Sequence, residues 1–213
     1  MVNFESINNM ENIYLYAGDL SENLIEQGHD NKFIGLSLSQ NNEDHILFDI
    51  TKKFPIQENT IDIFCAEDVM EHIDYELQIN IFNEIYRILK PNGIFRLAVP
   101  DYRCDVLLER TLKTNKGELK FDPGGGGKYS KLRRKVIDGG HIWFPNYENV
   151  KNIFDNSNFE DKKINFLHCF INENDFLLKD IDYGICYIQR TPDHDSRVSN
   201  PRRPMSIVVD AIK

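Results

Sequence analysis

The sequence of 213 residues has little that would place it in a membrane or outside the cell. It holds four cysteines with no CxxC pair, and no apolar run approaches the roughly 18 residues of a membrane helix. Its N-terminal stretch lacks a basic segment followed by an apolar one, so we expect no secretory signal. These absences predict a cytoplasmic protein with reduced thiols, no membrane association and no structural zinc site.

Basic residues are also scarce relative to acidic ones. The chain has 25 Lys and Arg against 34 Asp and Glu, a formal net charge of −9. This balance makes nucleic acid an unexpected partner, although it does not exclude a local basic patch. Apolar residues make up 41% of the chain, enough for a packed core, and the length fits a single domain over residues 1–213.

Short apolar runs alternate with helical patterns in the N-terminal half. Strands are predicted at 13–16, 32–38, 45–50, 61–66 and 93–99, and helices at 20–27 and 75–90. Strands that are apolar on both faces and separated by helices are typical of a parallel sheet covered on both sides. The sequence therefore predicts the α/β class.

The C-terminal half has a different pattern. Helices are predicted at 101–113 and 146–156, and strands at 162–170, 182–189 and 205–212. Between the two helices lie four consecutive glycines, 124–127, and a basic run, 128–135, without the spacing of a phosphate-binding P-loop. We interpret 102–145 as a lid that binds the acceptor, and 146–213 as a helix and strands that close the sheet.

Polar residues follow the predicted strands at the point where each ends. They are Gly18-Asp19, Ser37, Asp49, Glu67-Asp68 and Pro100-Asp101. In parallel sheets, ligands bind outside the carboxyl ends of the strands, near the point where the strand order reverses. These residues are therefore the predicted binding cleft.

The cleft lacks the dinucleotide fingerprint GxGxxG. The first turn reads Ala17-Gly18-Asp19 with no further glycine before Gly28, and Ser37 stands where an acid would bind a ribose. A nicotinamide-dependent oxidoreductase is thus disfavoured, and bound NADH would reveal one.

Several motifs together resemble the class I S-adenosylmethionine-dependent methyltransferases, and most closely their small type 11 family. They are DITKKFPI at 49–56, TIDIF at 60–64, VMEH at 69–72, RILKPNG at 87–93 and RLAVPD at 96–101. The ending at 197–213 resembles a subgroup associated with surface-polysaccharide biosynthesis. The resemblance implies a single domain with a Rossmann-like, mostly parallel seven-stranded sheet, helices on both faces, and a cofactor-binding half at 1–101.

The same resemblance implies which residues bind S-adenosyl-L-methionine. The methionine-binding loop would be Ala17, Gly18 and Asp19, and Ser37 would bind the ribose. Asp49 and Ile50 would form the turn that contacts the adenine. Ala66 and Glu67 would lie beside the methyl group.

Methyl transfer to a hydroxyl needs a base, whereas an amine acceptor needs only its lone pair. His141, Asp68 and Asp101 are the candidate catalytic residues, against structural roles as a hydrogen-bonded histidine, a helix cap and a turn. We predict O-methylation of a sugar in a free glycan or a nucleotide-linked sugar. The rivals are a non-catalytic binding module and a methyltransferase acting on a small amine, a protein or a nucleic acid. No His, Asp or Glu cluster has metal-ligand spacing, so no metal ligand is predicted, although ligands from distant loops would escape this test.

Overall fold

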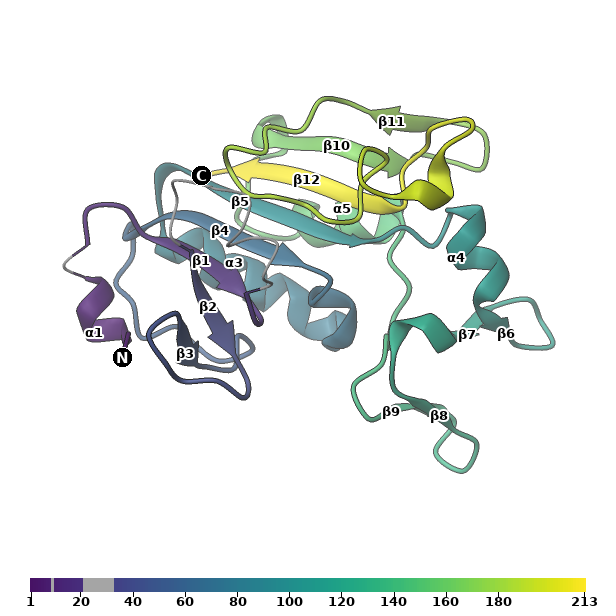
Figure 1. The fold of residues 1–213 in the computed structure, drawn as a ribbon, viewed down its shortest axis with the longest axis horizontal. Coiled ribbons are helices and arrows are strands. Elements are labelled where there is room, and N and C mark those ends of the chain that lie inside the picture. Colours follow the sequence, from purple (N-terminus) through teal and green to yellow (C-terminus); the bar gives the residue numbers. More distant parts are fainter. Residues whose placement is uncertain (9, 21–32) are drawn as a thin grey trace.

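The computed structural model describes residues 1–8, 10–20 and 33–213, and its centre is one twisted sheet (Figure 1). The strand order across this sheet is β11-β10-β12-β5-β4-β1-β2-β3. The strands are β1 (Tyr14–Ala17), β2 (Phe33–Ser37), β3 (His45–Leu47), β4 (Ile61–Glu67), β5 (Leu89–Pro100), β10 (Ile164–Phe170), β11 (Phe176–Leu178) and β12 (Ser206–Ile212). Because β1 pairs with both β2 and β4, the strand order reverses beside β1.

The sheet is mostly parallel, as the sequence predicts, but it has eight strands rather than seven. Strands β1 to β5 run parallel to one another. Strand β12 is antiparallel to β5 and to β10, and β11 is antiparallel to β10. The additional strand is β11, a three-residue edge strand too short to produce an alternating pattern in the sequence.

The α-helices of the described residues are α1 (Phe4–Ile7), α3 (Gln78–Ile88), α4 (Asp105–Arg110) and α5 (Tyr147–Asp155). The helix predicted at 20–27 lies outside the described residues, apart from Leu20. Helix α3 follows a 3-10 turn, η2 (Tyr75–Leu77), and ends earlier than predicted, because β5 already begins at Leu89. Asn92, with a φ of 65°, adopts the left-handed conformation within this strand.

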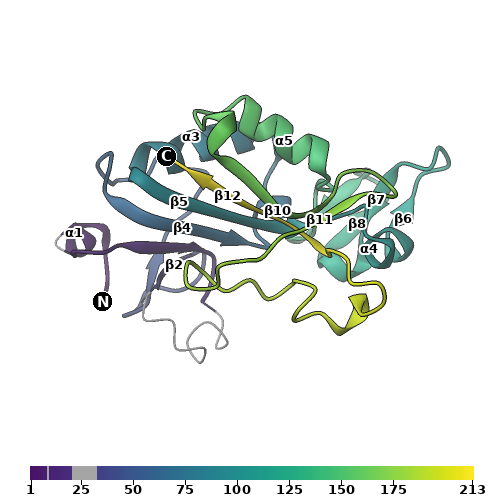
Figure 2. The same ribbon diagram turned by 90° about the horizontal axis from the view of Figure 1, so that it is seen from above.

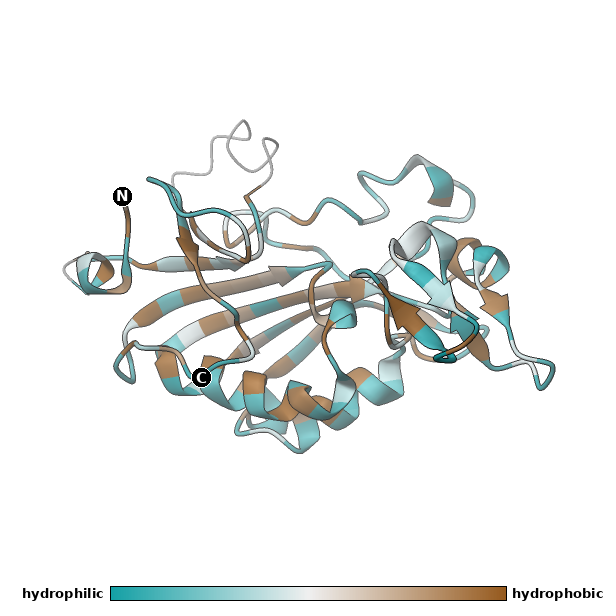
Figure 3. Ribbon diagram, turned by 90° about the horizontal axis from the view of Figure 1, so that it is seen from below, coloured by the Kyte–Doolittle hydropathy of each residue, from teal (hydrophilic) through white to brown (hydrophobic). Residues whose placement is uncertain are grey.

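Helices α3 and α5 cover one face of the sheet (Figure 2). Their apolar sides turn toward the strands, whereas the outer sides are hydrophilic (Figure 3). Phe82 of α3 packs against Phe95 of β5 and Phe154 of α5, with ring centroids 5.0 and 4.9 Å away. Each such buried side chain contributes roughly 1.5–3 kcal/mol through burial, so this layer is a main source of stability.

The opposite face is covered by the irregular segment 181–205 (Figure 2). The predicted strand at 182–189 is wrong: the segment is apolar because Cys186 and Ile188 pack on the sheet, but it pairs with no strand. Two of its carbonyl groups accept hydrogen bonds from a side chain instead. Arg96 of β5 donates from Nη1 to the carbonyl oxygens of Asp182 and Cys186, at 2.6 and 2.7 Å.

Residues 102–145 leave the sheet after β5 and return before α5. They contain α4, the short helix η3 (Pro123–Gly125) and two hairpins, β6 (Leu112–Lys113) with β7 (Leu119–Phe121) and β8 (Lys128–Ser130) with β9 (Lys135–Ile137). The helix predicted at 101–113 is therefore confined to α4. The backbone N–H of Tyr102 donates to the carbonyl of Pro145 at 2.9 Å, so the two ends of the insertion are joined.

All four cysteines, Cys65, Cys104, Cys169 and Cys186, are free and buried. Within the part of the chain that the structure describes, no helix is long and apolar enough to cross a membrane.

Candidate active site

A cavity of about 650 Å³ lies at the carboxyl ends of β1 to β4. Turns after each of these strands line it, together with η1 (Met70–His72) and two residues of the insertion, Gly139 and Ile142. This is the position predicted for a ligand beside the reversal of strand order. The lining includes five of the predicted site residues: Gly18, Asp19, Asp49, Ile50 and Asp68.

The turn after β1 approaches the cavity with bare backbone at Gly18. Its φ is 97°, which side chains rarely allow, and a Cβ there would lie 3.4 Å from Cγ2 of Val69. The Gly18 N–H donates to the carbonyl of Leu36 at 2.9 Å. A single glycine thus lets the backbone itself form this wall of the cavity, although the GxGxxG fingerprint is missing.

The turn after β3 presents a carboxylate. Oδ1 of Asp49 accepts bonds from the Thr51 N–H at 2.9 Å and from the Thr51 hydroxyl at 2.7 Å. Partial burial acts to raise the pKa of Asp49, but these bonds and the nearby Lys52 outweigh it and lower the pKa. Asp49 is therefore ionised at neutral pH and can accept bonds from hydroxyl or amino groups.

Four predicted cofactor residues do not line this cavity. Ala17 and Ala66 are fully buried within the sheet. The hydroxyl of Ser37 instead accepts the N–H groups of Ser39 and Gln40, at 3.0 and 2.8 Å, and shapes the turn after β2. Glu67 accepts the N–H of Gln189 at 2.6 Å, on the face covered by 181–205.

Asp68 lies between two cavities. It lines the large cavity and a second, polar cavity of about 280 Å³ whose other walls come from residues 189–190 and 194–197. Its Oδ2 is 3.0 Å from Nη2 of Arg190, whereas its buried Oδ1 has no hydrogen-bond partner among the residues that the structure describes. Asp68, with a φ of 52°, adopts the left-handed conformation directly after β4.

His141 lies behind the large cavity rather than in its wall, and it is 5% exposed. Nδ1 of His141 bonds to the Tyr102 hydroxyl, which donates to Oδ2 of Asp122 at 2.6 Å. Arg110 donates to both oxygens of Asp122, at 2.8 and 2.6 Å. Burial and the neighbouring His72 lower the pKa of His141 to about 4. The imidazole is therefore neutral at neutral pH.

Glu71 and His72 belong to the VMEH motif at 69–72, but neither is among the residues predicted for the site. His72 lines the large cavity, and its ring lies 4.7 Å from that of His141, centroid to centroid. Glu71 is fully buried, with Oε1 3.5 Å from Nε2 of His141. The spacing along the chain, 70 residues from Glu71 to His141, hides this cluster from any motif search.

Asp101 lines neither of these cavities. Its two carboxylate oxygens accept the N–H groups of Arg103 at 2.9 Å and of Phe170 at 2.7 Å. Burial raises its pKa to about 6. The geometry gives this carboxyl group a positioning role, tying the end of β5 to β10.

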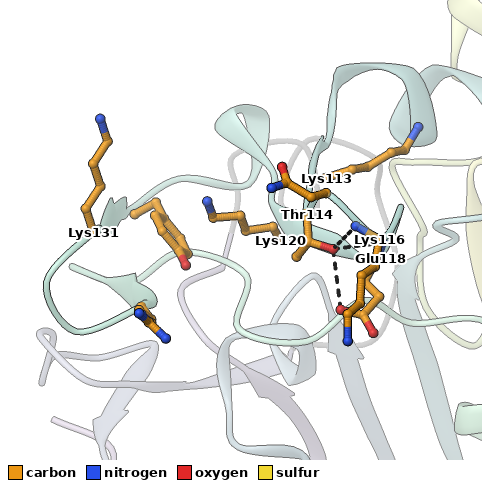
Figure 4. A pocket seen from close by; sticks show the side chains of 9 residues that line it. Lys113, Thr114, Lys116, Glu118, Lys120 and Lys131 are labelled. Carbon is orange, nitrogen blue, oxygen red and sulfur yellow. Dashed lines mark hydrogen bonds between the residues drawn. The ribbon is translucent and has the colours of Figure 1, made fainter.

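A third cavity, of about 540 Å³, lies between the two hairpins of the insertion. We call it the basic groove (Figure 4). Its cationic residues are Lys113, Lys116, Lys120, Lys131 and Arg134. Nζ of Lys120 lies 4.2 Å from the centre of the Tyr129 ring. In a chain of net charge −9, this concentration of positive charge indicates a surface for an anion.

The fold and the large cavity have the arrangement that the resemblance to class I, S-adenosylmethionine-dependent methyltransferases implies. The cavity residues fit that molecule: Gly18 lets the backbone come close, and ionised Asp49 can bind hydroxyl or amino groups. Apolar walls for a purine ring come from Phe48, Ile50 and Ile142.

The chain matches the model of the methyltransferase domain family over residues 15–164, and it therefore belongs to that family. No curated protein sequence matches it. Solved structures with the same fold include S-adenosylmethionine-dependent methyltransferases from three organisms. The one from Archaeoglobus fulgidus is 17% identical, with a TM-score of 0.53, over 99% of this chain and 90% of its own. The one from Mesorhizobium loti is 13% identical, with a TM-score of 0.54, over 94% of this chain and 90% of its own. The one from Methanosarcina mazei is 10% identical, with a TM-score of 0.53, over 100% of this chain and 98% of its own.

Proposed function

We propose that the protein transfers a methyl group from S-adenosylmethionine to a hydroxyl group of a sugar, in a glycan or a nucleotide-linked sugar. The observation that carries this proposal is the position of Asp68, whose carboxylate lines both the large cavity and the polar one. The donor would occupy the large cavity and the acceptor the polar cavity, so that Asp68 lies where the two meet.

The bound sulfonium supplies a methyl group that is intrinsically reactive, so the protein mainly orients and desolvates the reactants. A sugar hydroxyl must lose its proton to become a good nucleophile. The unpartnered Oδ1 of Asp68 would take that proton. The acceptor oxygen then bonds to the methyl carbon while the carbon–sulfur bond breaks, and that electron pair stays on sulfur. His141, which lines neither cavity, would act by positioning rather than as the base.

The polar cavity suits a ligand rich in hydroxyl groups. Its walls include Gln189, Arg190 and Ser196. Nη1 of Arg190 is buried and has no hydrogen-bond partner in the described part of the chain, so an acceptor oxygen would satisfy it. The basic groove would hold a negatively charged part of the same acceptor, such as a diphosphate. The resemblance of 197–213 to the polysaccharide-associated subgroup supports this acceptor class, and the free cysteines accord with the proposed cytoplasmic location.

The first test is calorimetric titration of the protein with S-adenosylhomocysteine. We expect Gly18→Val to weaken binding at least about tenfold, because a branched side chain would both strain the backbone and fill the cavity. Asp49→Ala should weaken it less. Lys162→Ala, an exposed residue remote from the cavity, is the control and should leave binding unchanged. Equal affinity in wild type and Gly18→Val would refute this assignment of the cofactor site.

The second test offers nucleotide-linked sugars and free oligosaccharides together with methyl-labelled S-adenosylmethionine. Asp68→Asn should lower kcat about 100-fold or more, since the loss of a general base costs about 10²–10⁴-fold. The binding of S-adenosylhomocysteine should persist in this variant. If the protein instead methylates an amine, and Asp68→Asn leaves the kcat of that reaction unchanged, a small-amine acceptor is favoured. If no methyl group moves although the cofactor binds, the non-catalytic module becomes the better interpretation.

A further inference from the structure

Three side chains with metal-ligating atoms meet beside the large cavity. Glu71 and His72 come from η1, and His141 comes from the return of the insertion. One ligand atom from each lies within 4.8 Å of the other two. Glu71 and His141 are buried and His72 is half-buried, so the cluster opens only toward the side of His72, which lines the cavity.

The carboxylate of Glu71 has no partner within the described residues. Both Oε1 and Oε2 are buried without a hydrogen bond, and the side chain is fully inaccessible to solvent. Nε2 of His141 lies 3.5 Å from Oε1, longer than a normal hydrogen bond. Burying a carboxyl group in this way is costly unless something else binds it, and a cation would do so.

Both imidazole rings are fixed through their Nδ1 atoms. His72 Nδ1 lies 2.6 Å from the carbonyl oxygen of Gly139, which can only accept, so Nδ1 carries the hydrogen. The Tyr102 hydroxyl gives its hydrogen to Asp122, so His141 Nδ1 must donate to Tyr102. Each ring therefore keeps a lone pair on Nε2. Metal-ligating histidines show this arrangement, in which the other ring nitrogen donates to a carbonyl or a carboxylate-linked group.

Backbone contacts hold the two contributing segments together. The Ile142 N–H donates to the carbonyl of Glu71 at 2.9 Å, and Nε1 of Trp143 donates to the carbonyl of Met70 at 2.8 Å. The cluster is thus pre-organised, rather than assembled from two independent loops.

We propose that Glu71, His72 and His141 bind a divalent transition-metal cation of the zinc type. Two imidazoles and one carboxylate are a donor set that suits zinc and leaves a coordination position open. Ligand atoms around a tetrahedral zinc lie about 3.3 Å apart, close to the 3.5 Å between Glu71 Oε1 and His141 Nε2. The ring of His72, at the cavity wall, completes the set by a small inward movement.

The open position would face the large cavity beside His72. There the cation would bind the reacting hydroxyl of an acceptor that extends past Asp68 from the polar cavity, and it would make that proton easier to remove. This role rests on the proposed O-methyl transfer. The cation site itself does not depend on that function, and it can be tested without any methyl donor.

The experiment is calorimetric titration of the chelator-treated full chain with zinc chloride, repeated with cobalt chloride while the visible absorption of the bound ion is recorded. We expect one cation per chain and a cobalt spectrum of low coordination number. Glu71→Gln and His72→Asn should each weaken binding about 100-fold or more, and Tyr102→Phe about 10-fold to 100-fold, since it frees the imidazole of His141. His194→Asn, which removes an exposed histidine outside the cluster, should leave binding unchanged.

The proposal fails if the wild type binds no zinc, or if His194→Asn abolishes binding that Glu71→Gln retains. Should Glu71→Gln not fold by circular dichroism, His72→Asn decides, because its side chain is only half-buried. Titration of the same samples with S-adenosylhomocysteine separates the two proposals. If the protein binds S-adenosylhomocysteine but not zinc, the metal site alone is overturned. If it binds zinc but not S-adenosylhomocysteine, the metal site is supported and the result counts against the proposed function.

Discussion

The two faces of the sheet are covered in different ways. On one face, α3 and α5 satisfy their own backbone groups and contribute apolar side chains, with Phe154 packed between Phe82 and Phe159. On the other, the irregular segment 181–205 relies on buried side chains of the strands. Arg96 of β5 donates hydrogen bonds to two of the segment's carbonyl oxygens, and Glu67 of β4 accepts the N–H of Gln189.

This difference matters for the active site. A helical layer tolerates volume-conserving changes of its apolar side chains with modest loss of stability. The irregular segment is instead fixed residue by residue, and this fixing brings Arg190 to 3.0 Å from Asp68. We infer that the irregular backbone on the second face is what allows polar groups to be placed in the polar cavity.

The largest test of this comparison is Arg96→Ala. The guanidinium is fully buried, pairs with both carboxylate oxygens of Asp210 at 2.7 Å, and supports the 181–205 segment. Removing one partner of a buried pair costs about 3–5 kcal/mol, because the other charge stays buried and unpaired. Urea unfolding should show this loss. A loss below about 1 kcal/mol would mean that the segment holds its position without Arg96.

The second test uses pH. Burial and the neighbouring Asp68 raise the pKa of Glu67 from 4.5 to about 7. The stability contributed by its protonated form is thus complete below the unfolded value and is lost as pH rises through about 7. We expect wild-type stability to fall between about pH 5 and 7 by roughly 1 kcal/mol per pH unit more than that of Glu67→Gln. Asp101, with a pKa of about 6, adds a similar slope to both proteins, so only the difference reports Glu67. Parallel pH profiles would contradict the assignment.

The helical face should respond more gently to a small change. Ile153 of α5 is 1% exposed, and Ile153→Val removes one methylene group from the layer. The expected loss is about 0.5–1.5 kcal/mol, measured by thermal or urea unfolding. A loss as large as that of Arg96→Ala would show that this layer is as tightly specified as the irregular one.

The smallest effect is expected on the outer side of the same helix. Lys151 is paired with Asp155 at 2.6 Å, and both side chains are exposed by about two-fifths. Lys151→Ala should change the free energy of unfolding by less than about 0.5 kcal/mol, since exposed pairs are screened by water and salt. A larger change would point to an unrecognised role for the ion pair with Asp161.

The sequence predicts the strands of the parallel half because each is a short apolar run, buried on both faces. It also predicts which turns border the cavity, since Gly18, Asp49 and Asp68 each follow such a run. The segment 182–189 has the same apolar character, yet it packs on the sheet instead of joining it. Composition records burial but not the hydrogen-bond partners, and here those partners are side chains of Arg96 and Glu67.

The candidate site shows the same limit. Sequence reasoning selects His141 as a candidate base, but it cannot tell that Tyr102 and Glu71 enclose its ring. The contacts join residues 39 and 70 positions apart, so their meeting depends on how the insertion returns to the sheet. Only the three-dimensional arrangement reveals the cluster.

The joined ends of residues 102–145 have a consequence for the way such a protein can change. Because Tyr102 and Pro145 are already bonded backbone to backbone, the length of chain between them adds little to the entropy of closing the loop. The two hairpins and the basic groove could be replaced by other sequences while the sheet and its donor cavity stay intact. We propose that, in evolution or in the laboratory, this part of the chain can be exchanged so that one methyltransferase scaffold acquires a new acceptor.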